Sequence, residues 1–461
     1  MRSLPRRAYL TLKHRGPRAL VRRALTLPAR TWRQRRERAT QQLGFPEHLV
    51  PTMDRWYRHR QPKVAVVIPT YGDPGLVTEA VRSIRATVPR RDLVRIIVCD
   101  DGSDARHRRR LRRLRGIELV EGAEQRGFAA NCNRGIERLA PGEDLVLLNS
   151  DVVAHPGWLE GLAYTAHNKQ DAGIVGPKLL YADGTIQSAG SVRNAGAPEW
   201  FDHRYRFKPA LHPPASHLVA CLAVTGAAMY VRRECLAAIG GRLDEAYGMA
   251  FEDVDWCLRA WDAGFVVYYT PYATLTHLES RTRGREQGGR ELAAQQHFWS
   301  RWRDWLDDRP VRHPDGGLRI VYVTERTAVG GGHRVVFQHL LALQEAGHHV
   351  ELWSLEGRPD WFDLGTVPVR TFAGYDELER ELEPLDALKV ATWWVTSEVV
   401  WRASVRHGIP VYFVQDIEDG YYPDDPEIAA RALDSYRQEF RVLTTSTHNR
   451  ERLREFYIDA P

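Results

Sequence analysis

The chain carries a short apolar run that ends in proline, Lys63-Val64-Ala65-Val66-Val67-Ile68-Pro69, which is typical of the first strand of an α/β unit. A second run of this kind, Leu318-Arg319-Ile320-Val321-Tyr322-Val323-Thr324, lies far downstream. Turn residues and then a helical pattern follow each run, and strands that alternate with helices predict parallel sheets. A polar stretch rich in Pro and Gly, residues 307–317, separates the two. The sequence therefore predicts two α/β units.

Three further strands are predicted in the first unit, and polar residues follow two of them. Val94–Cys99 ends at Asp100-Asp101-Gly102-Ser103, Ile117–Val120 is short, and Asp144–Leu148 ends at Asn149-Ser150-Asp151. A helix is predicted over Phe128–Leu139. Ligands of open α/β sheets bind at the carboxyl ends of the strands, so these polar residues predict a ligand site.

The composition is ordinary for a soluble globular protein: 461 residues, 43% hydrophobic and 27% charged, enough for two or three domains. The five cysteines are an odd number and include no Cys-x-x-Cys pair. This predicts buried core thiols in a reducing compartment, with neither a disulfide framework nor structural zinc. Because no run of about 18 apolar residues and no secretory signal occurs, we expect a cytoplasmic protein.

The positive charge is concentrated at the N-terminus. Residues 1–60 hold 16 Lys and Arg against 3 Asp and Glu, a balance of +13, whereas the whole chain is +6, so residues 61–461 carry about −7. Leucine and aromatic residues are interleaved with the basic ones in this arm, which is typical of contact with an anionic membrane surface. A solvated helical extension is the alternative. Nucleic acid is not an expected partner, because the net charge predicts no basic face outside the arm.

Three residues are candidates for chemistry, and each also has a plain structural interpretation. Asp151 directly follows a buried strand, where it could hold a divalent cation that neutralises a departing diphosphate, or merely end a turn. Oxygen ligands suit Mg²⁺ or Mn²⁺, and an added imidazole favours Mn²⁺. Asp253 opens a predicted helix. The helix dipole favours acidic residues at this position, which is the structural interpretation; the functional one is that an acid here deprotonates an acceptor hydroxyl. A lone histidine such as His277 is usually structural.

Taken in order, the motifs of the first unit resemble glycosyltransferase family 2, which has the GT-A fold. The motifs that carry the resemblance span about 63–305: Val66-Val67-Ile68-Pro69-Thr70-Tyr71-Gly72-Asp73, Val98-Cys99-Asp100-Asp101-Gly102-Ser103, Gln125-Arg126-Gly127-Phe128-Ala129-Ala130-Asn131-Cys132-Asn133-Arg134-Gly135, Asn149-Ser150-Asp151, Thr225-Gly226-Ala227-Ala228, Glu252-Asp253-Val254-Asp255 and His277-Leu278-Glu279-Ser280. The set looks most like the rhamnosyltransferase branch that builds bacterial surface polysaccharides.

The resemblance implies a role for each site residue. The nucleotide-sugar site would be formed by Pro69, Thr70, Tyr71, Asp100, Asp101, Arg126, Gly127, Asn149, Ser150 and Trp256. Within it, Asp100 would accept from the imide N–H of uracil or thymine, and Trp256 would wall the sugar pocket. Asp151 and His277 would hold Mn²⁺ or Mg²⁺. Asp253 would be the general base, with Glu252 orienting the acceptor. The family often has a second acid where this chain has Asn149, which leaves Asp151 as the main carboxylate ligand.

The second unit resembles the N-terminal half of a glycosyltransferase family 4 enzyme of GT-B fold, a Rossmann-like half that mainly holds the acceptor. Gly330-Gly331-Gly332-His333 lies between its first strand and helix, where glycines admit a ligand close to the backbone or simply make a tight turn. The chain stops before any donor half, so this unit is not expected to transfer sugar unaided. The expected organisation is a basic arm at 1–60, a GT-A domain at 61–310 and this half-domain at 317–461.

The expected activity is that of an inverting, metal-dependent glycosyltransferase in cell-surface polysaccharide synthesis. It would move a sugar, with rhamnose the first guess, from a dTDP- or UDP-sugar to a glycan or lipid-linked acceptor at the inner face of the plasma membrane. Two other classes stay open. One is a carbohydrate-binding or scaffold protein on an inactive transferase fold, which would not need Asp151, Asp253 and His277 together. The other is a nucleotidyltransferase, which usually has a Gly-rich basic loop after its first strand.

Overall fold

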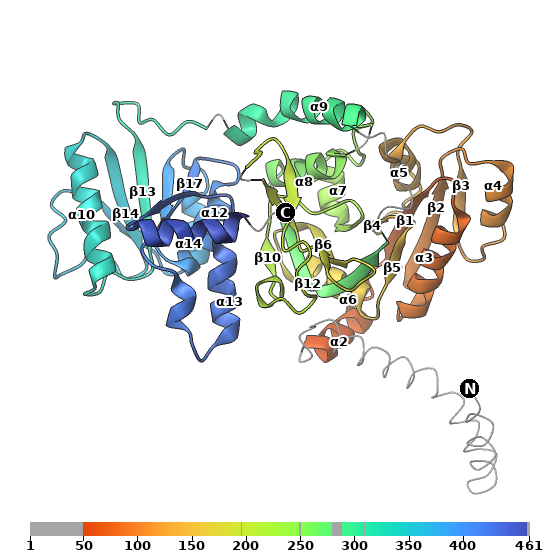
Figure 1. Ribbon diagram of the computed structural model, residues 1–461, viewed down its shortest axis with the longest axis horizontal. Helices are drawn as coiled ribbons and strands as arrows, with labels where there is room; N and C mark the ends of the chain where they lie inside the picture. The colour runs from red at the N-terminus through yellow and green to blue at the C-terminus, as the bar shows by residue number, and fades with distance from the viewer. Residues whose placement is uncertain (1–48, 195, 249, 279–287, 308, 459–461) are drawn as a thin grey trace, which may run out of the picture.

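Two β-sheets with their helices lie side by side along the long axis of the molecule in a computed structural model (Figure 1). It describes residues 49–194, 196–248, 250–278, 288–307 and 309–458. Most of the predicted basic arm lies outside these residues. The described end of that arm is helix α2 (Val50–Arg60), which buries Met53 and Tyr57. None of the described helices combines the length and the apolar character needed to cross a bilayer.

The first sheet is mixed, with the order β10-β12-β6-β11-β4-β1-β2-β3. Its strands are β1 (Val64–Thr70), β2 (Val94–Asp100), β3 (Glu118–Glu121), β4 (Asp144–Leu148), β5 (Val152–Ala154), β6 (Ala172–Leu180), β7 (Ile186–Ser188), β10 (Val219–Ala220), β11 (Ala228–Val231) and β12 (Val266–His277). Four of the seven neighbouring pairs along this order are parallel. The predicted mixed, mostly parallel α/β sheet of a GT-A-like fold is confirmed.

The predicted strands agree closely with those observed, because buried apolar runs leave little choice of conformation. Every residue of β1 and of β4 is buried, and both strands begin and end within one residue of their predicted bounds. The predicted helix over Phe128–Leu139 ends earlier, since α5 is Phe128–Ile136. Its last residues form a tighter turn in which the N–H groups of Arg138 and Leu139 donate to the carbonyls of Gly135 and Ile136.

In the described part of the chain, seven helices follow α2 in the first unit and pack around this sheet. They are α3 (Pro74–Thr87), α4 (Ala105–Leu111), α5, α6 (Trp158–Asn168), α7 (Arg233–Ala238), α8 (Glu252–Asp262) and α9 (Gly288–Asp307), with short 3₁₀ turns η2 (Arg91–Leu93) and η3 (Pro213–Ala215). Asp73 and Asp104 cap α3 and α4 by accepting from the backbone N–H groups of Gly75 and His107. A small separate ribbon pairs β8 (Ser191–Arg193) with β9 (Phe201–His203).

The prediction of buried core thiols is confirmed, since all five cysteines are free and buried. Burial raises the pKa of Cys99, Cys221 and Cys235 to about 12. These thiols therefore stay protonated and act as small core residues.

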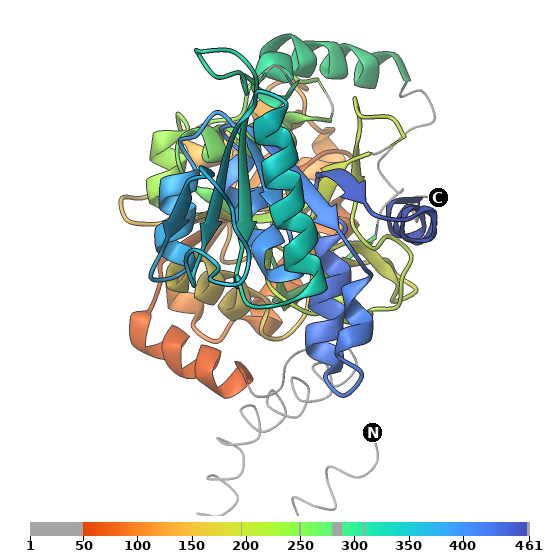
Figure 2. The ribbon, with the colours of Figure 1, turned by 90° about the vertical axis from the view of Figure 1, so that its left-hand side faces the viewer.

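The second sheet is entirely parallel, and Figure 2 shows it facing the viewer. Its order is β15-β14-β13-β16-β17-β18, which is a doubly wound α/β order. The strands are β13 (Arg319–Thr324), β14 (His349–Ser354), β15 (Val369–Thr371), β16 (Leu388–Ala391), β17 (Ile409–Val414) and β18 (Arg441–Thr444). The helices are α10 (Gly331–Glu345), α11 (Tyr375–Leu382), α12 (Trp394–Ser404), α13 (Pro426–Ser435) and α14 (Thr447–Ile458), with the 3₁₀ turn η4 (Glu418–Tyr421).

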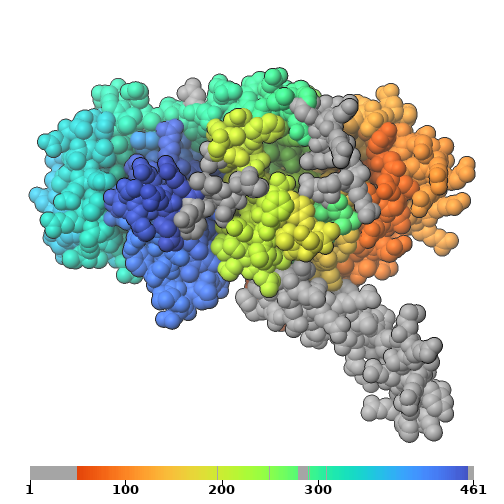
Figure 3. All heavy atoms as spheres, viewed as in Figure 1, coloured from red at the N-terminus to blue at the C-terminus, as the bar shows by residue number. Residues whose placement is uncertain are grey.

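The two units lie against each other (Figure 3). Trp401 of α12 and Val405, which follows that helix, belong to the main core of the first unit, and the ring of Trp401 meets that of Trp261 edge-on at 5.9 Å. Arg309, between the units, donates to the carbonyls of Ser404, Val405 and Gly408 at the end of α12. The interface therefore fixes the end of α12 as well as covering apolar surface.

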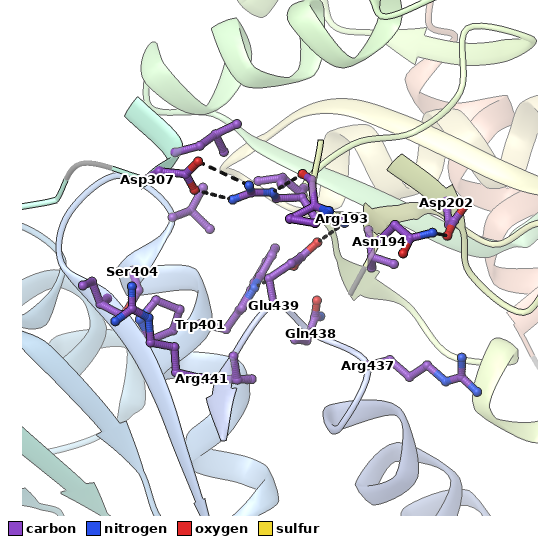
Figure 4. Close-up of a pocket in the computed structure, with 18 of the residues that line it drawn as sticks. Arg193, Asn194, Asp202, Asp307, Trp401, Ser404, Arg437, Gln438, Glu439 and Arg441 are labelled. Carbon is purple, nitrogen blue, oxygen red and sulfur yellow. Dashed lines mark hydrogen bonds and ion pairs between the residues drawn. The ribbon is translucent and has the colours of Figure 1, made fainter. Parts of the chain in front are cut away.

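A cavity of about 510 Å³ lies within this interface (Figure 4). On one wall Arg193 pairs with Asp307 at 2.7 Å, and its backbone N–H donates to Glu439. Glu439 also accepts from the indole N–H of Trp401 at 3.0 Å, and burial raises the pKa of its carboxyl group. The cavity is thus lined by partners drawn from both units.

Asp434, in α13, forms the most buried polar contact between the units. Its carboxylate accepts from Arg204 and Tyr205, and from the imidazole of His217 at 2.8 Å. Arg204 and Asp434 are almost fully buried. Burial alone would raise the pKa of Asp434, but the charges of Arg204 and His217 outweigh it and hold the pKa below its usual range. Its stabilising contribution is therefore present above about pH 4 and is lost as the pH falls further.

We expect Asp434→Ala to lower the free energy of unfolding by about 3–5 kcal/mol, because it leaves the guanidinium of Arg204 buried without its counter-charge. Urea unfolding at neutral pH, followed by tryptophan fluorescence, measures the loss. Asp307→Ala is the matched control: it also removes an interface carboxylate, but one whose side chain is 44% exposed, and it should cost less than about 1 kcal/mol. Equal losses in the two variants would contradict the role given to Asp434.

Candidate functional site

Three buried polar atoms without hydrogen-bond partners lie at the carboxyl ends of the adjacent strands β4, β1 and β2. Within the described residues, these atoms are Asn149 Oδ1, Thr70 Oγ1 and Asp100 Oδ1. His107 Nε2 lies 3.6 Å from Asp100 Oδ1, beyond hydrogen-bond distance. An unpaired buried polar group costs about 1–3 kcal/mol, so three at one sheet edge indicate a surface that a ligand completes.

Asp101 holds the Arg126–Gly127 turn against this edge. Its carboxylate accepts from the backbone N–H groups of Arg126 and Gly127 at 3.0 and 2.9 Å, and from Arg134 at 2.8 Å. Gly127 has φ +94° and begins α5, a conformation that favours glycine. Asp101 therefore positions this turn, and the half-exposed side chain of Arg126 reaches Glu245 at 3.0 Å.

Asp151 and His277 meet because β5 pairs antiparallel with β12, with Val152 opposite His277. The distance from Asp151 Oδ1 to His277 Nε2 is 3.1 Å. On the other side of the ring, His277 Nδ1 lies 2.8 Å from Gln187 Oε1 in β7. When Nδ1 carries the ring proton and donates it to Gln187, the lone pair of Nε2 faces a carboxylate oxygen of Asp151. Two such acceptor atoms need a shared proton or a cation between them.

Asp253 is fixed beside the same strands by a backbone contact. The N–H of Gly226 donates to Asp253 Oδ2 at 2.7 Å, and the N–H of Val254 lies 2.9 Å from Oδ1. A Cβ at position 226 would lie 3.2 Å from the Cβ of Asp253, so glycine permits this approach. The neighbouring Ala227 accepts from the N–H of Asn149 at 2.9 Å, which links Asp253 to the end of β4.

The other acids of this motif differ in position. Asp255 is fully buried and accepts from the indole N–H of Trp302 in α9 at 2.8 Å, with Arg259 at 2.9 Å. Asp255 therefore attaches α9 to α8. Glu252 is half-buried at the first position of α8, next to Asp253.

Two of the expected positions need correction. Trp256 is completely buried and its indole N–H donates to the carbonyl of Arg242 at 3.0 Å, so it is a core residue and walls no open pocket. Asp100 is also completely buried, with Oδ2 accepting from the N–H of Ser103 and Oδ1 unpaired, so a ligand reaches its carboxylate only if the loop over it moves. By contrast, Tyr71 is 51% exposed at the end of β1, and Pro69 is buried within that strand. Ser150 is half-buried between Asn149 and Asp151.

Sequence reasoning missed two positioning residues. Gln187 lies in a short strand with no recognisable motif, and only the fold brings it to His277. Gly226 belonged to a quoted motif, and only the packing of α8 beside it brings Asp253 to its N–H.

A further group of potential metal ligands lies elsewhere, at the start of the second sheet. Ligand atoms of His313, Asp315 and His349 lie within 4.8 Å of one another, and the two imidazoles stack at 3.6 Å. Asp315 is 79% exposed, so this trio is a weak candidate beside the more buried Asp151 and His277.

Comparison with known proteins places residues 62–302 in the family model described as "Glycosyltransferase like family 2". "Uncharacterized protein y4gI" of Sinorhizobium fredii is 31% identical over 250 residues, 50% of this chain and 26% of that protein. "O-antigen biosynthesis protein RfbC" of Myxococcus xanthus is 29% identical over 414 residues, 81% of this chain and 31% of that protein. The chain thus spans between a quarter and a third of the length of these two relatives.

A third relative is "N-acetylglucosaminyl-diphospho-decaprenol L-rhamnosyltransferase" of Mycobacterium tuberculosis, 26% identical over 215 residues, 42% of this chain and 69% of that protein. The similarity to the Myxococcus protein is longer than residues 62–302 and so extends beyond the family model. Since the matched region covers more than half of the 461 residues, the chain belongs to glycosyltransferase family 2.

Proposed function

We propose that this protein is an inverting, metal-dependent glycosyltransferase of cell-surface polysaccharide synthesis. It would transfer a sugar, with rhamnose as the first candidate, from a dTDP- or UDP-sugar to a glycan or lipid-linked acceptor. The names of the Myxococcus and Mycobacterium relatives support sugar transfer in such pathways. The observation that carries the proposal is geometric. The pairing of β5 with β12 brings Asp151 to His277, and the pairing of β11 with β4 sets Gly226, which binds Asp253, beside the end of β4.

The donor set of Asp151 and His277 fits a divalent cation, with Mn²⁺ or Mg²⁺ proposed. A carboxylate oxygen and an imidazole nitrogen face each other at 3.1 Å, and Gln187 accounts for the other ring nitrogen. When bound, the cation would neutralise the leaving diphosphate. The chain's own part is to hold the two ligands in register through β5 and β12.

The unpaired atoms of Thr70 and Asn149 are proposed to bind the nucleotide sugar, together with Tyr71, Ser150 and the Arg126–Gly127 turn. Asp100 and Asp101 would act from behind this surface, because both are buried and bound to backbone N–H groups. Contact of Asp100 with the nucleobase therefore requires that its loop move. Asp101 already binds the backbone N–H groups of Arg126 and Gly127.

Asp253 is the proposed general base, with Glu252 beside it to orient the acceptor. Displacement at an anomeric carbon with inversion needs a base on the side opposite the leaving group. The Gly226 N–H holds Oδ2 at 2.7 Å and so restricts the carboxylate to one orientation. Asp255 cannot share this role, since it is buried against α9.

The second unit is proposed to be a Rossmann-like half of a GT-B fold that binds the acceptor glycan. A cavity of about 610 Å³ lies at the carboxyl ends of β13, β16 and β17, beside Gly330 and Gly332. The rings of Trp393 and Tyr421 stack at 5.8 Å on its wall, with Asp416 and Glu418 nearby. Aromatic faces and carboxylates suit the C–H patches and hydroxyls of a sugar. The proposed domains are a basic arm at 1–60, a GT-A domain at 61–310 and this half-domain at 317–461.

The site of action is proposed to be the cytoplasmic face of the plasma membrane. The N-terminal arm, predicted to contact that membrane, lies almost wholly outside the described residues.

Asp253→Asn should reduce transfer at least about a thousandfold, because the amide cannot accept the proton of the acceptor hydroxyl, while donor affinity stays nearly unchanged. Product formation from a panel of nucleotide sugars and calorimetric titration of the donor measure the two effects. Asp262→Asn, at the other end of α8, is the control and should keep full activity. A variant at 253 that turns over like the unchanged protein would disprove the base assignment.

Chelation by EDTA should abolish turnover, and Mn²⁺ or Mg²⁺ should restore it. Asp151→Ala and His277→Ala should each weaken metal-dependent donor binding at least about tenfold, and Gln187→Ala less, since it only orients the imidazole. Donor titration with and without metal provides the measurement, with His313→Ala as a control at the other ligand group. Full activity in EDTA would remove the metal from the proposal.

Trp393→Ala and Tyr421→Ala should each weaken acceptor-glycan binding by about five- to tenfold and leave donor affinity unchanged, because an aromatic contact contributes about 1 kcal/mol. Acceptor titration measures this. Tyr375→Phe, in the same unit but outside the cavity lining, is the control. Unchanged acceptor affinity in both cavity variants would assign the acceptor elsewhere.

A further inference from the structure

Helix α4 and the turn after it form a strongly basic surface that the net charge of residues 61–461 conceals. Residues 105–116 contain seven arginines and no acid. Six of these arginines are exposed: Arg106, Arg109, Arg110, Arg112, Arg113 and Arg115. The expectation that the chain has no basic face outside its N-terminal arm is therefore wrong, because an excess of acids elsewhere cancels this local charge in the sum.

These arginines have few partners inside the protein. Arg112 pairs with Glu121 at 2.8 Å. Across the described ranges, no ion pair involves Arg109, Arg110 or Arg113. Arg106 and Arg110 of α4 stand four residues apart, a spacing at which like charges destabilise a helix. A surface that costs stability and lacks internal partners is best explained by an anion outside the chain.

A groove of about 370 Å³ continues this surface onto α3. Arg82, Arg85 and Arg91 line it, around a floor that includes Val81, Ala86 and Leu114. Arg85 lies directly against the α4 turn, because a Cβ at Gly116 would be 2.2 Å from its Nη2. The basic surface thus combines a broad face of arginines with a shallow apolar recess.

We propose that this surface, formed by α3, α4 and the turn to Gly116, docks on an anionic lipid bilayer. Arginines that surround an apolar recess match lipid phosphates above acyl chains. Nucleic acid fits less well, since residues 74–116 contain no Phe, Tyr or Trp on which a base could stack, and the ring of His107 is buried. The surface occupies the end of the molecule farthest from the second unit, where nothing described covers it (Figures 1 and 3).

Docking here would also orient the candidate site. Asp104 caps α4 only four residues beyond the end of β2, and His107 of α4 lies 3.6 Å from Asp100. The bilayer would therefore lie beside the carboxyl ends of β1 and β2. This inference does not depend on sugar transfer, because it concerns binding and is tested without a donor.

The test is co-sedimentation of the full chain with vesicles of phosphatidylglycerol and phosphatidylcholine, and with vesicles of phosphatidylcholine alone. The variant Arg109→Glu, Arg110→Glu, Arg113→Glu should weaken binding to the anionic vesicles about a hundredfold, at roughly fivefold per arginine. A charge-matched control, Arg380→Glu, Arg450→Glu, Arg454→Glu, changes three exposed arginines of the second unit and should bind like the unchanged chain.

Hydrogen–deuterium exchange reports on the surface itself, whatever the N-terminal arm contributes. Residues 105–116 should exchange more slowly with anionic vesicles and not with neutral ones. Unaltered exchange there, equal loss of binding in both triple variants, or binding to duplex DNA without binding to vesicles would each overturn the proposal.

Discussion

The arrangement of the candidate site depends on the reversal of the chain after β4. In a purely parallel sheet, the ends of consecutive strands lie side by side but do not face one another. Here β11 runs antiparallel to β4, and β5 runs antiparallel to the end of β12. The β5–β12 pairing joins segments more than 100 residues apart, so that Asp151 meets His277. The β11–β4 pairing sets Gly226, which binds Asp253, beside the end of β4. The backbone ladders, and not the side chains, set the register.

The second unit helps to hold this part of the first unit in place through one buried carboxylate. Asp434 binds Arg204 and Tyr205, and the N–H of Arg204 donates to the carbonyl of Gly190. Gly190 follows β7, which carries Gln187 and so the orientation of His277. A contact made by the C-terminal unit therefore supports the position of His277 in the N-terminal one. Removing a partner from such a buried pair is costly, which favours a fixed relation between the units.

The sequence predicts most where burial is complete. The strands β1 and β4 were located because every residue in them is apolar or covered, and the ordered motifs identified the family from the residues alone. Side-chain roles were less predictable, since a residue's neighbours come from distant segments. Trp256 and Asp100 share motifs with exposed residues but turn inward, because α8 packs one face on the core and β2 ends beneath His107. Gln187 had no signal of its own.

The basic surface on α4 was likewise not predictable from the net charge. A sum over 401 residues, 61–461, hides seven arginines within 12, because electrostatic attraction to a surface falls off over about 10 Å and depends on local arrangement. The fold decides whether such a run is neutralised. Here α4 lies at the end of the molecule, and among the described residues Arg112 is the one arginine of this run in an ion pair, with Glu121 at 2.8 Å. Since α4 starts directly after the loop that carries Asp100 and Asp101, an anion bound to it would act on the edge of the site and not on a remote face.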